Sequence, residues 1–280
     1  MNLYLQGLST DPAAIERIAA LVGAARIVPV GADAFRCEQV DITPAVKNAL
    51  DAACAAAQLD YTPWPEERRL SDFKLVAMDM DSTLITIECI DEIADMQGLK
   101  PEVSAITEAA MRGEIEFPES LARRVALLRG LDAGALQRVY DERLQLSPGA
   151  LPMLRTIQTS GLKTLLVSGG FTFFTNRLKE KLGIDYSHAN ELEVVDGKLT
   201  GKVSGTIVDA DEKRRTVERV CAAMGISPSQ AIVIGDGAND LQMMGIAGLS
   251  VAFRAKPKVR AQADIALNYV GLDGLLTFLN

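Results

Sequence analysis

The sequence predicts an α/β protein, with a doubly wound parallel sheet, a helical insertion and a smaller α+β domain in front. Three observations favour this fold class. The chain has 280 residues, which is more than one typical domain. From residue 74 onward, short apolar runs alternate with amphipathic helical patterns, as expected of βαβ units. Residues 1–61 instead show strand and helix patterns in the order βαββαβ.

The order βαββαβ over residues 1–61 is typical of a ferredoxin-like domain. Its strand patterns are NLYLQGL, RIVPVGA, FRCEQVD and LDYTPW. Asp11 and Thr43 are predicted to begin the two helices, because each side chain caps a helix and a proline follows it. Residues 62–73 are predicted to be a linker, since two prolines and a charge cluster lack periodicity there. Such a linker predicts few contacts across the boundary.

The parallel-sheet pattern of a Rossmann-like fold covers residues 74–280. Buried strands are predicted at KLVAMDMD, TLLVSGG, AIVIGD and LSVAF, with DIAL a weaker candidate. Helical patterns separate them at LPMLRTIQTSG, TFFTNRLKEKLG, EKRRTVERVCAAMG, NDLQMMGIAG and KPKVRAQA. Residues 86 to about 146 contain helical patterns only, which predicts a cap over the carboxyl end of the first strand. ELEVVDGKLTGKVSGTIV predicts a β-hairpin that turns at Asp-Gly.

Charge and composition exclude several classes of protein. The chain has 37 Asp and Glu against 29 Lys and Arg, a formal net charge of −8. Nucleic acid and anionic membrane surfaces are therefore not expected partners, because both require a basic surface. No uncharged apolar run approaches the roughly 18 residues of a membrane span, and the N-terminus lacks the pattern of a signal peptide. We expect a cytoplasmic protein whose partner is a small molecule.

Cysteine and histidine usage limits the chemistry further. The single histidine, His188, excludes a site built from several imidazoles. It could complete one Ser-His-Asp or Cys-His set, but no G-x-S-x-G motif accompanies it, so it is expected to be structural. The cysteines are scattered, without a CxxC pair or zinc-ligand spacing. They predict reduced and mostly buried thiols: Cys37, Cys54, Cys89 and Cys221.

Two carboxylates follow the first strand of the predicted parallel sheet. Asp79 and Asp81, in the run DMDST, project from the strand end where doubly wound sheets bind their ligands. Like charges this close raise at least one pKa unless a cation intervenes. The pair therefore suits a nucleophile beside a general acid, a divalent metal site, or both. A helix-capping turn is the alternative interpretation.

Two more polar clusters follow later strands. Ser168, Gly169 and Gly170 offer a hydroxyl and two open amides, which suit a phosphate cradle, although Ser-Gly-Gly is also an ordinary loop. Asp236 belongs to the run GDGAND, whose carboxylates and amide are hard oxygen ligands suited to Mg²⁺. Lys213 begins a helix and supplies the positive charge that the set otherwise lacks, unless it is a solvated surface lysine.

In combination, these motifs resemble those of the haloacid dehalogenase-like hydrolases. DxDST, SGG, a lysine and GDGAND follow in this order at strand or helix ends, and the resemblance covers residues 74–280. Asp81, which the dehalogenase branch lacks, favours phosphoryl transfer, and the DKTGT of the cation-pump branch is absent. Within the superfamily, the chain is similar to the phosphoserine phosphatase family through DST, the helical cap and four cap residues, Glu88, Met111, Phe117 and Arg124.

This resemblance implies Mg²⁺-dependent hydrolysis of O-phospho-L-serine to L-serine and phosphate, the last step of serine biosynthesis. Asp79 is implied to be the nucleophile that forms an aspartyl-phosphate. Asp81 is implied to protonate the leaving oxygen and then to deprotonate water. The implied ligands of the single Mg²⁺ are Asp79, the Asp81 carbonyl and Asp236. The implied substrate-binding residues are Glu88, Met111, Phe117, Arg124, Ser168, Gly169, Gly170, Lys213 and Asn239. Asn239 and Asp240 are implied to lie close to the metal ligands.

The chemistry of the residues agrees with these implied roles. Phosphoryl transfer needs positioning and charge neutralisation, and a carboxylate approaches a phosphate dianion only where Mg²⁺ and Lys screen the repulsion. Phosphoserine also carries an ammonium and a carboxylate, which Glu88 and Arg124 suit unless both are solvated helix charges. Met111 and Phe117 are implied to shield the closed pocket from water; the alternative is that they are core residues.

The N-terminal domain resembles an ACT domain by its element order only. ACT domains often bind amino acids at the loop after the first strand, but residues 7–12 read GLSTDP, without the Asp-Arg-Pro-Gly pattern common in that family. A dimerisation or solubility role is the equal alternative, and a homodimer is compatible with the sequence. Two other functions stay open: a phosphotransferase or a phosphatase for another small phosphomonoester, and a non-catalytic amino-acid sensor.

Overall fold

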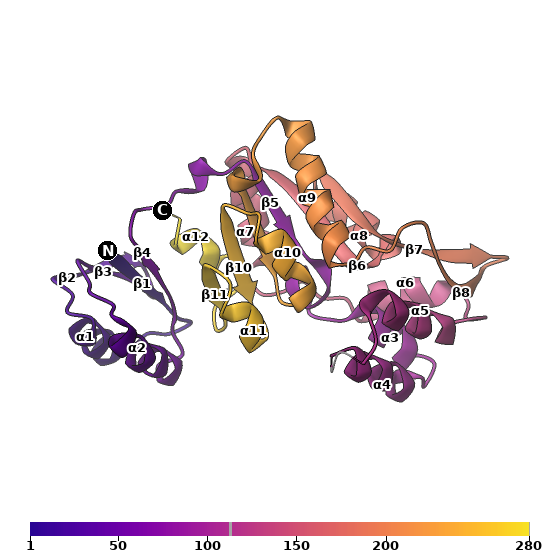
Figure 1. Ribbon diagram of the computed structural model, residues 1–280, viewed down its shortest axis with the longest axis horizontal. Helices are drawn as coiled ribbons and strands as arrows, with labels where there is room; N and C mark the ends of the chain where they lie inside the picture. The colour runs from indigo at the N-terminus through magenta and orange to yellow at the C-terminus, as the bar shows by residue number, and fades with distance from the viewer. Residues whose placement is uncertain (112–113, 280) are drawn as a thin grey trace.

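A computed structural model of the chain describes residues 1–111 and 114–279, and it contains two β-sheets side by side (Figure 1). The N-terminal sheet has the strand order β2-β3-β1-β4, with every neighbouring pair antiparallel. Its strands are β1 Asn2–Gln6, β2 Arg26–Gly31, β3 Ala34–Glu38 and β4 Asp60–Trp64. Helices α1 Pro12–Leu21 and α2 Pro44–Ala56 complete the order βαββαβ, which confirms the predicted ferredoxin-like fold.

Both helices of this domain begin where the sequence predicts. The Asp11 side chain accepts a hydrogen bond from the N–H of Ala13, and Thr43 accepts one from Val46. Satisfying a free N–H group at the first turn stabilises the helix start by about 1 kcal/mol. The apolar sides of the helices pack on one face of the sheet, in a core that includes Leu3, Leu5, Ile15, Ile18 and Leu50.

The second sheet has the order β11-β10-β9-β5-β6-β7-β8. All neighbouring strands are parallel except β7 and β8, which form the predicted hairpin. The strands are β5 Leu75–Met78, β6 Lys163–Phe171, β7 Tyr186–Val195, β8 Lys198–Ser204, β9 Ala231–Gly235, β10 Leu249–Phe253 and β11 Ile265–Leu267. This arrangement confirms the predicted doubly wound α/β fold.

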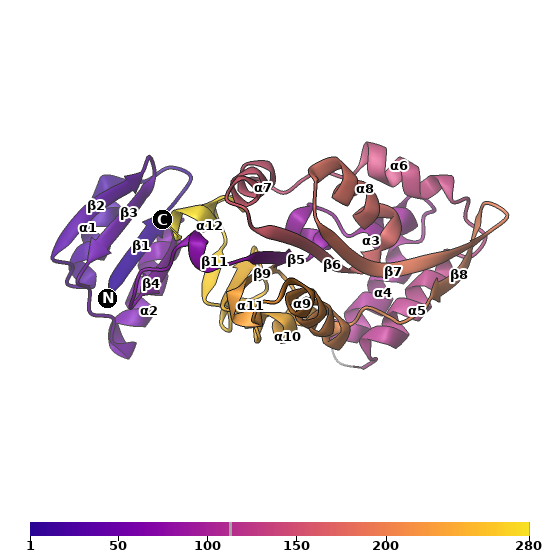
Figure 2. The same cartoon turned by 90° about the horizontal axis from the view of Figure 1, so that it is seen from above.

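Helices cover both faces of the parallel sheet (Figure 2). One face carries α7 Ala150–Thr159 and α8 Thr172–Leu182, and the other carries α9 Ala210–Met224, α10 Leu241–Met244 and α11 Pro257–Arg260. Val76 and Met78 of β5 pack into the first of these cores, whereas Leu75 and Ala77 pack into the second. All four are fully buried, which explains why the β5 sequence is continuously apolar rather than alternating.

Some elements differ from the sequence-based prediction. Strand β7 begins at Tyr186, in the polar run YSHAN, and pairs with β6 before it enters the hairpin. This segment is only partly buried, so it needs no continuous apolar run. The helices predicted from NDLQMMGIAG and KPKVRAQA shorten to α10 and α11, and the unpredicted helix α12 Gly274–Thr277 lies near the C-terminus.

The segment between β5 and α7 forms the predicted helical cap over the carboxyl end of β5 (Figure 2). Backbone hydrogen bonds join this cap to the β7–β8 hairpin. The N–H groups of Gly130 and Ala133 donate to the carbonyls of Leu199 and Gly197, and the N–H of Leu199 donates to Leu131, each at 2.8 Å. The cap helices are α3 Cys89–Asp95, α4 Lys100–Met111, α5 Phe117–Leu127 and α6 Gly134–Glu142.

The N-terminal domain contacts the C-terminal end of the chain through buried groups, so the expectation of few contacts is wrong. Trp64 Nε1 donates to the carbonyl of Phe278 at 3.0 Å, and Gln6 Nε2 donates to that of Gly274 at 2.9 Å. The Tyr4 ring packs edge-on against Phe278. Strand β4 also runs to Trp64, inside the stretch predicted to be a linker. The domain boundaries themselves stay a prediction.

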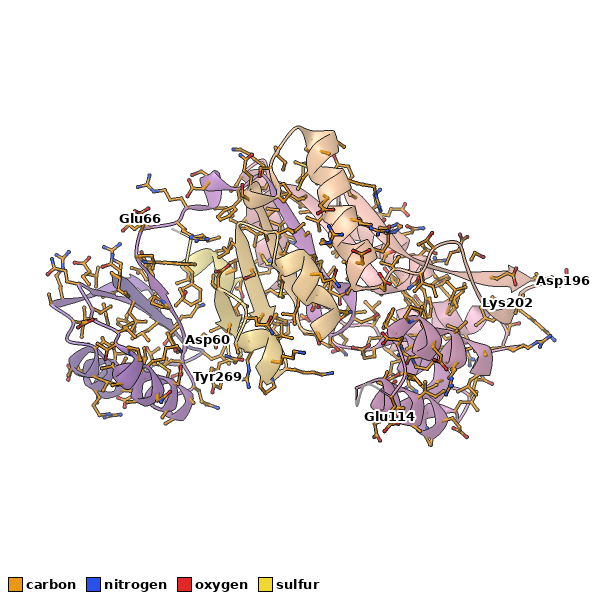
Figure 3. All side chains as sticks on the ribbon, viewed as in Figure 1. Asp60, Glu66, Glu114, Asp196, Lys202 and Tyr269 are labelled. Atoms are coloured by element: carbon orange, nitrogen blue, oxygen red, sulfur yellow. The ribbon has the colours of Figure 1, made fainter. Side chains whose placement is uncertain are left out.

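A buried carboxylate completes this contact. Asp60, at the start of β4, is 1% exposed and lies against the segment that follows β11, next to Tyr269 (Figure 3). It accepts hydrogen bonds from the N–H groups of Asn268, Tyr269 and Val270 at 2.7, 3.0 and 3.1 Å. These bonds tie together the first and last parts of the sequence.

Asp60→Ala is expected to lower the free energy of unfolding by about 3 kcal/mol or more, because three buried N–H groups lose their acceptor and each costs about 1–3 kcal/mol. Denaturant unfolding measures the loss. The control is Asp51→Ala in the same domain, where an exposed carboxylate bonds Lys47 and Tyr61; its cost should stay below about 1 kcal/mol. Equal losses for the two variants would show that Asp60 does not anchor the domain.

Among the described residues, no helix combines the length and the apolar character needed to cross a membrane.

Candidate active site

Asp79 lies at the carboxyl end of β5, in the middle of the parallel sheet. Its N–H donates to the carbonyl of Ile234 on β9 at 3.0 Å, which continues the strand pairing by one residue. Its Oδ1 accepts the N–H of Met80 at 2.7 Å. The other oxygen, Oδ2, lies 2.7 Å from Nζ of Lys213. The carboxylate is therefore held on both sides.

Lys213, in the first turn of α9, is fully buried between two carboxylates. Its Nζ lies 2.8 Å from Oδ1 of Asp240 and contacts Asp79. Burial alone would lower the pKa of Lys213, but Asp240 and Asp79 raise it above its ordinary value, so the ammonium stays charged. Oδ2 of Asp240 accepts the N–H groups of Asp236 and Gly237, so Asp240 orients Lys213 and the loop after β9.

Three carboxylates form an acidic cluster at this edge of the sheet. Oxygens of Asp79, Asp236 and Asp240 all lie within 4.8 Å of one another. Burial, followed by the charges of Asp240 and Glu88, raises the pKa of Asp236 to about 7. Burial also raises the pKa of Asp79, against the opposing effect of Lys213. One lysine does not balance this much buried negative charge, and the donors are hard oxygens, so the cluster fits a divalent metal ion.

Asp81 lies in the turn that links β5 to the cap, where Ser82 has a φ of +54°. Its Oδ1 accepts the N–H of Cys89 at 3.0 Å. Its Oδ2 faces Gly170 so closely that a Cβ there would lie 2.5 Å away, so a side chain at that position would displace the Asp81 carboxylate. Burial, followed by the charge of Glu88, raises the pKa of Asp81 to about 7. A carboxyl group with this pKa can both give and take a proton near neutral pH.

The Ser168–Gly170 loop is an irregular stretch within the last part of β6, where the pairing register with β7 shifts, and it faces the same edge of the sheet. The Gly170 N–H donates to Ser168 Oγ at 2.8 Å, so this amide is engaged within the loop and the Ser168 hydroxyl proton can serve a ligand. Asn190 on β7 fixes the loop from behind: its Nδ2 donates to the carbonyl of Gly169 at 2.7 Å, and its Oδ1 accepts the N–H of Val208. No motif in the sequence points to Asn190.

The cap supplies the opposite wall of the site. Phe117 reaches the Ser168–Gly170 loop, where a Cβ on Gly169 would lie 3.1 Å from the ring. Glu88 Oε1 accepts the Ser82 hydroxyl at 2.7 Å. Arg124 Nε donates to the carbonyl of Ser120 at 3.3 Å, and within the described part of the chain Arg124 forms no ion pair. The side chain of Met111, the last residue of α4, lies outside the described residues.

A cavity of about 740 Å³ lies between the cap and the sheet edge. Lys213 is buried behind its wall, through contact with Asp79. The cavity brings most of the predicted residues together: Asp79, Asp81, Glu88, Phe117, Arg124, Ser168, Gly169, Gly170, Asp236 and Asn239.

The cavity also has lining residues that the sequence analysis missed. Asp91 lies three positions after Glu88, and Ser120 lies four positions before Arg124, so helical spacing from the predicted pair would have found both. Lys256 and Lys258 follow β10, and the carboxyl-end rule applied to that strand would have found them.

Residues 73–248 match the family of haloacid dehalogenase-like hydrolases, the class that the fold and the acidic sheet edge define. Residues 3–50 match a domain family of unknown function, DUF4072. A phosphoserine phosphatase of Polaromonas sp. is 59% identical over 213 residues, which cover 74% of this chain and 90% of the relative.

Solved structures agree with this match. A probable phosphoserine phosphatase from Vibrio cholerae superposes with a TM-score of 0.85 at 36% identity, over 99% of this chain and 86% of the other. A phosphoserine phosphatase solved as a phospho-aspartyl intermediate analogue gives a TM-score of 0.70 at 38% identity, over 77% of this chain and 100% of the other. The chain therefore belongs to the haloacid dehalogenase-like hydrolases and, within them, to the phosphoserine phosphatase family. It is a phosphatase.

Proposed function

We propose that the chain hydrolyses O-phospho-L-serine to L-serine and phosphate with Mg²⁺, as the last step of serine biosynthesis. The observation that carries this proposal is a single cavity lined by groups of two kinds. Asp79, Asp236 and the Ser168 hydroxyl line it in front of buried Lys213, which suits a phosphate and a metal ion. Glu88 and Arg124 line the same cavity, and they suit an ammonium and a carboxylate. The family name of the relatives points to the same substrate.

Asp79 is the proposed nucleophile. Its carboxylate attacks phosphorus, the bond from phosphorus to the serine oxygen breaks, and an aspartyl-phosphate forms. Asp81 gives its proton to the leaving serine oxygen. In the second half, Asp81 takes a proton from water as the water oxygen attacks phosphorus, which releases phosphate and restores Asp79. The pKa of Asp81, raised to about 7, suits both roles.

The remaining groups hold the phosphoryl oxygens and balance their charge. The Ser168 hydroxyl, the Gly169 amide and Lys213 are the proposed donors. Mg²⁺ would be held by Asp79, Asp236 and the Asp81 carbonyl, and when bound it neutralises negative charge on the phosphoryl group. Lys213 already touches Asp79, so it screens the repulsion between this carboxylate and a phosphate dianion.

Arg124→Ala tests the substrate assignment. We expect KM for phosphoserine to rise about 10- to 150-fold, because a charge-assisted hydrogen bond to the substrate carboxylate is lost. KM for phosphoethanolamine, which has no carboxylate, should change little. Phosphate release gives both values.

The matched control for this variant is Arg123→Ala. Arg123 is the neighbouring arginine of α5, but it is exposed and pairs with Glu119. This change should leave KM for both substrates near the wild-type values. Equal losses on phosphoserine and phosphoethanolamine in Arg124→Ala would mean that Arg124 acts on the phosphate or on the fold, and the carboxylate assignment would be wrong.

A phosphotransferase would use the same groups and differ only in the acceptor, so product analysis with added alcohols separates the two reactions. The intact set of catalytic candidates argues against a non-catalytic sensor: Asp79, Asp81, Lys213 and Asp236.

We also propose that residues 74–280 form the phosphatase domain, that residues 62–73 link it to the accessory domain 1–61, and that the protein is cytoplasmic. The full match of a shorter phosphoserine phosphatase supports the first, and the four free cysteines support the last.

A further inference from the structure

Helix α5 presents one row of side chains to the cavity. Phe117, Ser120, Leu121 and Arg124 follow the spacing of a single helix face, and all of them line the cavity. Phe117 is implied by the family resemblance to shield the pocket from water, and Arg124 is assigned to the substrate carboxylate. Ser120 lies between them and has no part in the mechanism described above.

The Ser120 hydroxyl is buried and has no hydrogen-bond partner among the described residues. The residue is 1% exposed. A helical serine commonly donates to the carbonyl four residues earlier, but here only the backbone N–H of Ser120 bonds to Glu116. Because an unpaired buried hydroxyl destabilises the free protein, its presence on a cavity wall indicates a partner that arrives with the ligand.

The neighbouring Arg124 indicates which group of the ligand pairs with the Ser120 hydroxyl. Arg124 Nε donates to the Ser120 carbonyl, so the guanidinium is fixed beside Ser120. The proposed phosphate-binding groups, such as Asp79 and Ser168, line the cavity at the sheet edge, whereas Ser120 lines it from α5 of the cap. A hydroxyl donor beside a guanidinium matches the second oxygen of a carboxylate.

We propose that Ser120 is a specificity-determining residue, whose hydroxyl donates a hydrogen bond to the α-carboxylate of the substrate alongside Arg124. The proposal rests on the proposed function, since it assumes a substrate with that carboxylate. The carboxylate would then be bound by two residues on one turn of α5, Ser120 and Arg124.

Ser120→Ala separates this role from a structural one. We expect KM for phosphoserine to rise about 10-fold, with kcat within about twofold of wild type and KM for phosphoethanolamine unchanged. The melting temperature should stay the same or rise, because alanine removes an unpaired hydroxyl and has a higher helix propensity. A hydroxyl that served only the fold would instead lower the melting temperature and leave the ratio of the two KM values unchanged.

Thr175→Val is the matched control. Thr175 in α8 also carries a fully buried hydroxyl without a partner among the described residues, but it does not line the cavity. Valine keeps its shape and removes the hydroxyl, so the melting temperature should hold while both KM values stay at wild type.

The outcomes distinguish the two proposals. If the wild-type chain hydrolyses phosphoserine and Ser120→Ala leaves its KM unchanged, or raises both KM values equally, the role of Ser120 is overturned and the proposed function stands. If the wild-type chain does not hydrolyse phosphoserine but hydrolyses another phosphomonoester, the proposed function fails, and the carboxylate role of Ser120 fails with it.

Discussion

Asp79→Asn is expected to abolish phosphoserine hydrolysis, with kcat falling at least about 10⁴-fold. The amide is nearly the same size as the carboxylate but is a poor nucleophile. It also removes the negative charge that Lys213 Nζ contacts at 2.7 Å and one ligand of the acidic cluster. Phosphate release measures the loss, and an unchanged circular dichroism spectrum shows that the fold is kept.

Trapping the intermediate identifies the nucleophile directly. The wild-type protein, quenched in acid during turnover, should carry phosphate on the peptide that contains Asp79, and Asp79→Asn should carry none. Asp91→Asn is the control, since Asp91 lines the same cavity without an assigned role and should still give the phosphopeptide. Phosphate attached to any residue other than Asp79 would overturn the assignment.

Removing divalent metal with EDTA is expected to lower kcat/KM about 10³-fold, and added Mg²⁺ should restore it, because a metal contributes several kcal/mol of charge stabilisation. Asp236→Asn should raise the Mg²⁺ concentration needed for half-maximal activity about 10-fold or more. Burial and acidic neighbours raise the pKa of the Asp236 carboxylate to about 7. A bound cation would stabilise this buried negative charge.

Thermal stability gives a readout for metal that does not depend on activity. Mg²⁺ should raise the melting temperature of the wild-type protein, because an ion that binds only the folded state stabilises it. The rise should be much smaller in Asp236→Asn. Full activity in EDTA, or equal Mg²⁺ stabilisation of the two proteins, would remove Asp236 from the metal site.

Much of the fold and of the sheet-edge site followed from local sequence patterns. The continuous apolar run of β5 predicted a strand buried on both faces, and the position of Asp79 directly after it predicted the sheet edge. The capping side chains Asp11 and Thr43 predicted both helix starts in the first domain. The cap residues Glu88 and Arg124 depended instead on the family resemblance, because helix charges carry no signal of their own.

The missed features depend on contacts between distant parts of the chain. Gln6 and Asp60 are ordinary polar strand residues in sequence, and their burial requires the C-terminal segment to pack against them. Asn190 lies within a polar run, and only the fold places it behind Gly169. Lys213 was predicted to supply a positive charge, but its position between Asp79 and Asp240 depends on the tertiary structure.

Backbone hydrogen bonds join the cap to the β7–β8 hairpin, so a movement of the cap would also involve the hairpin. The connection around Gly130 and Ala133 pairs with Gly197 and Leu199, as a short extra strand would. If the cap swings away from the cavity, it either carries the hairpin with it or breaks these bonds. Because the hairpin continues β7, which pairs with β6, a movement of the cap would reach the Ser168–Gly170 segment near the end of β6 through these strand pairings.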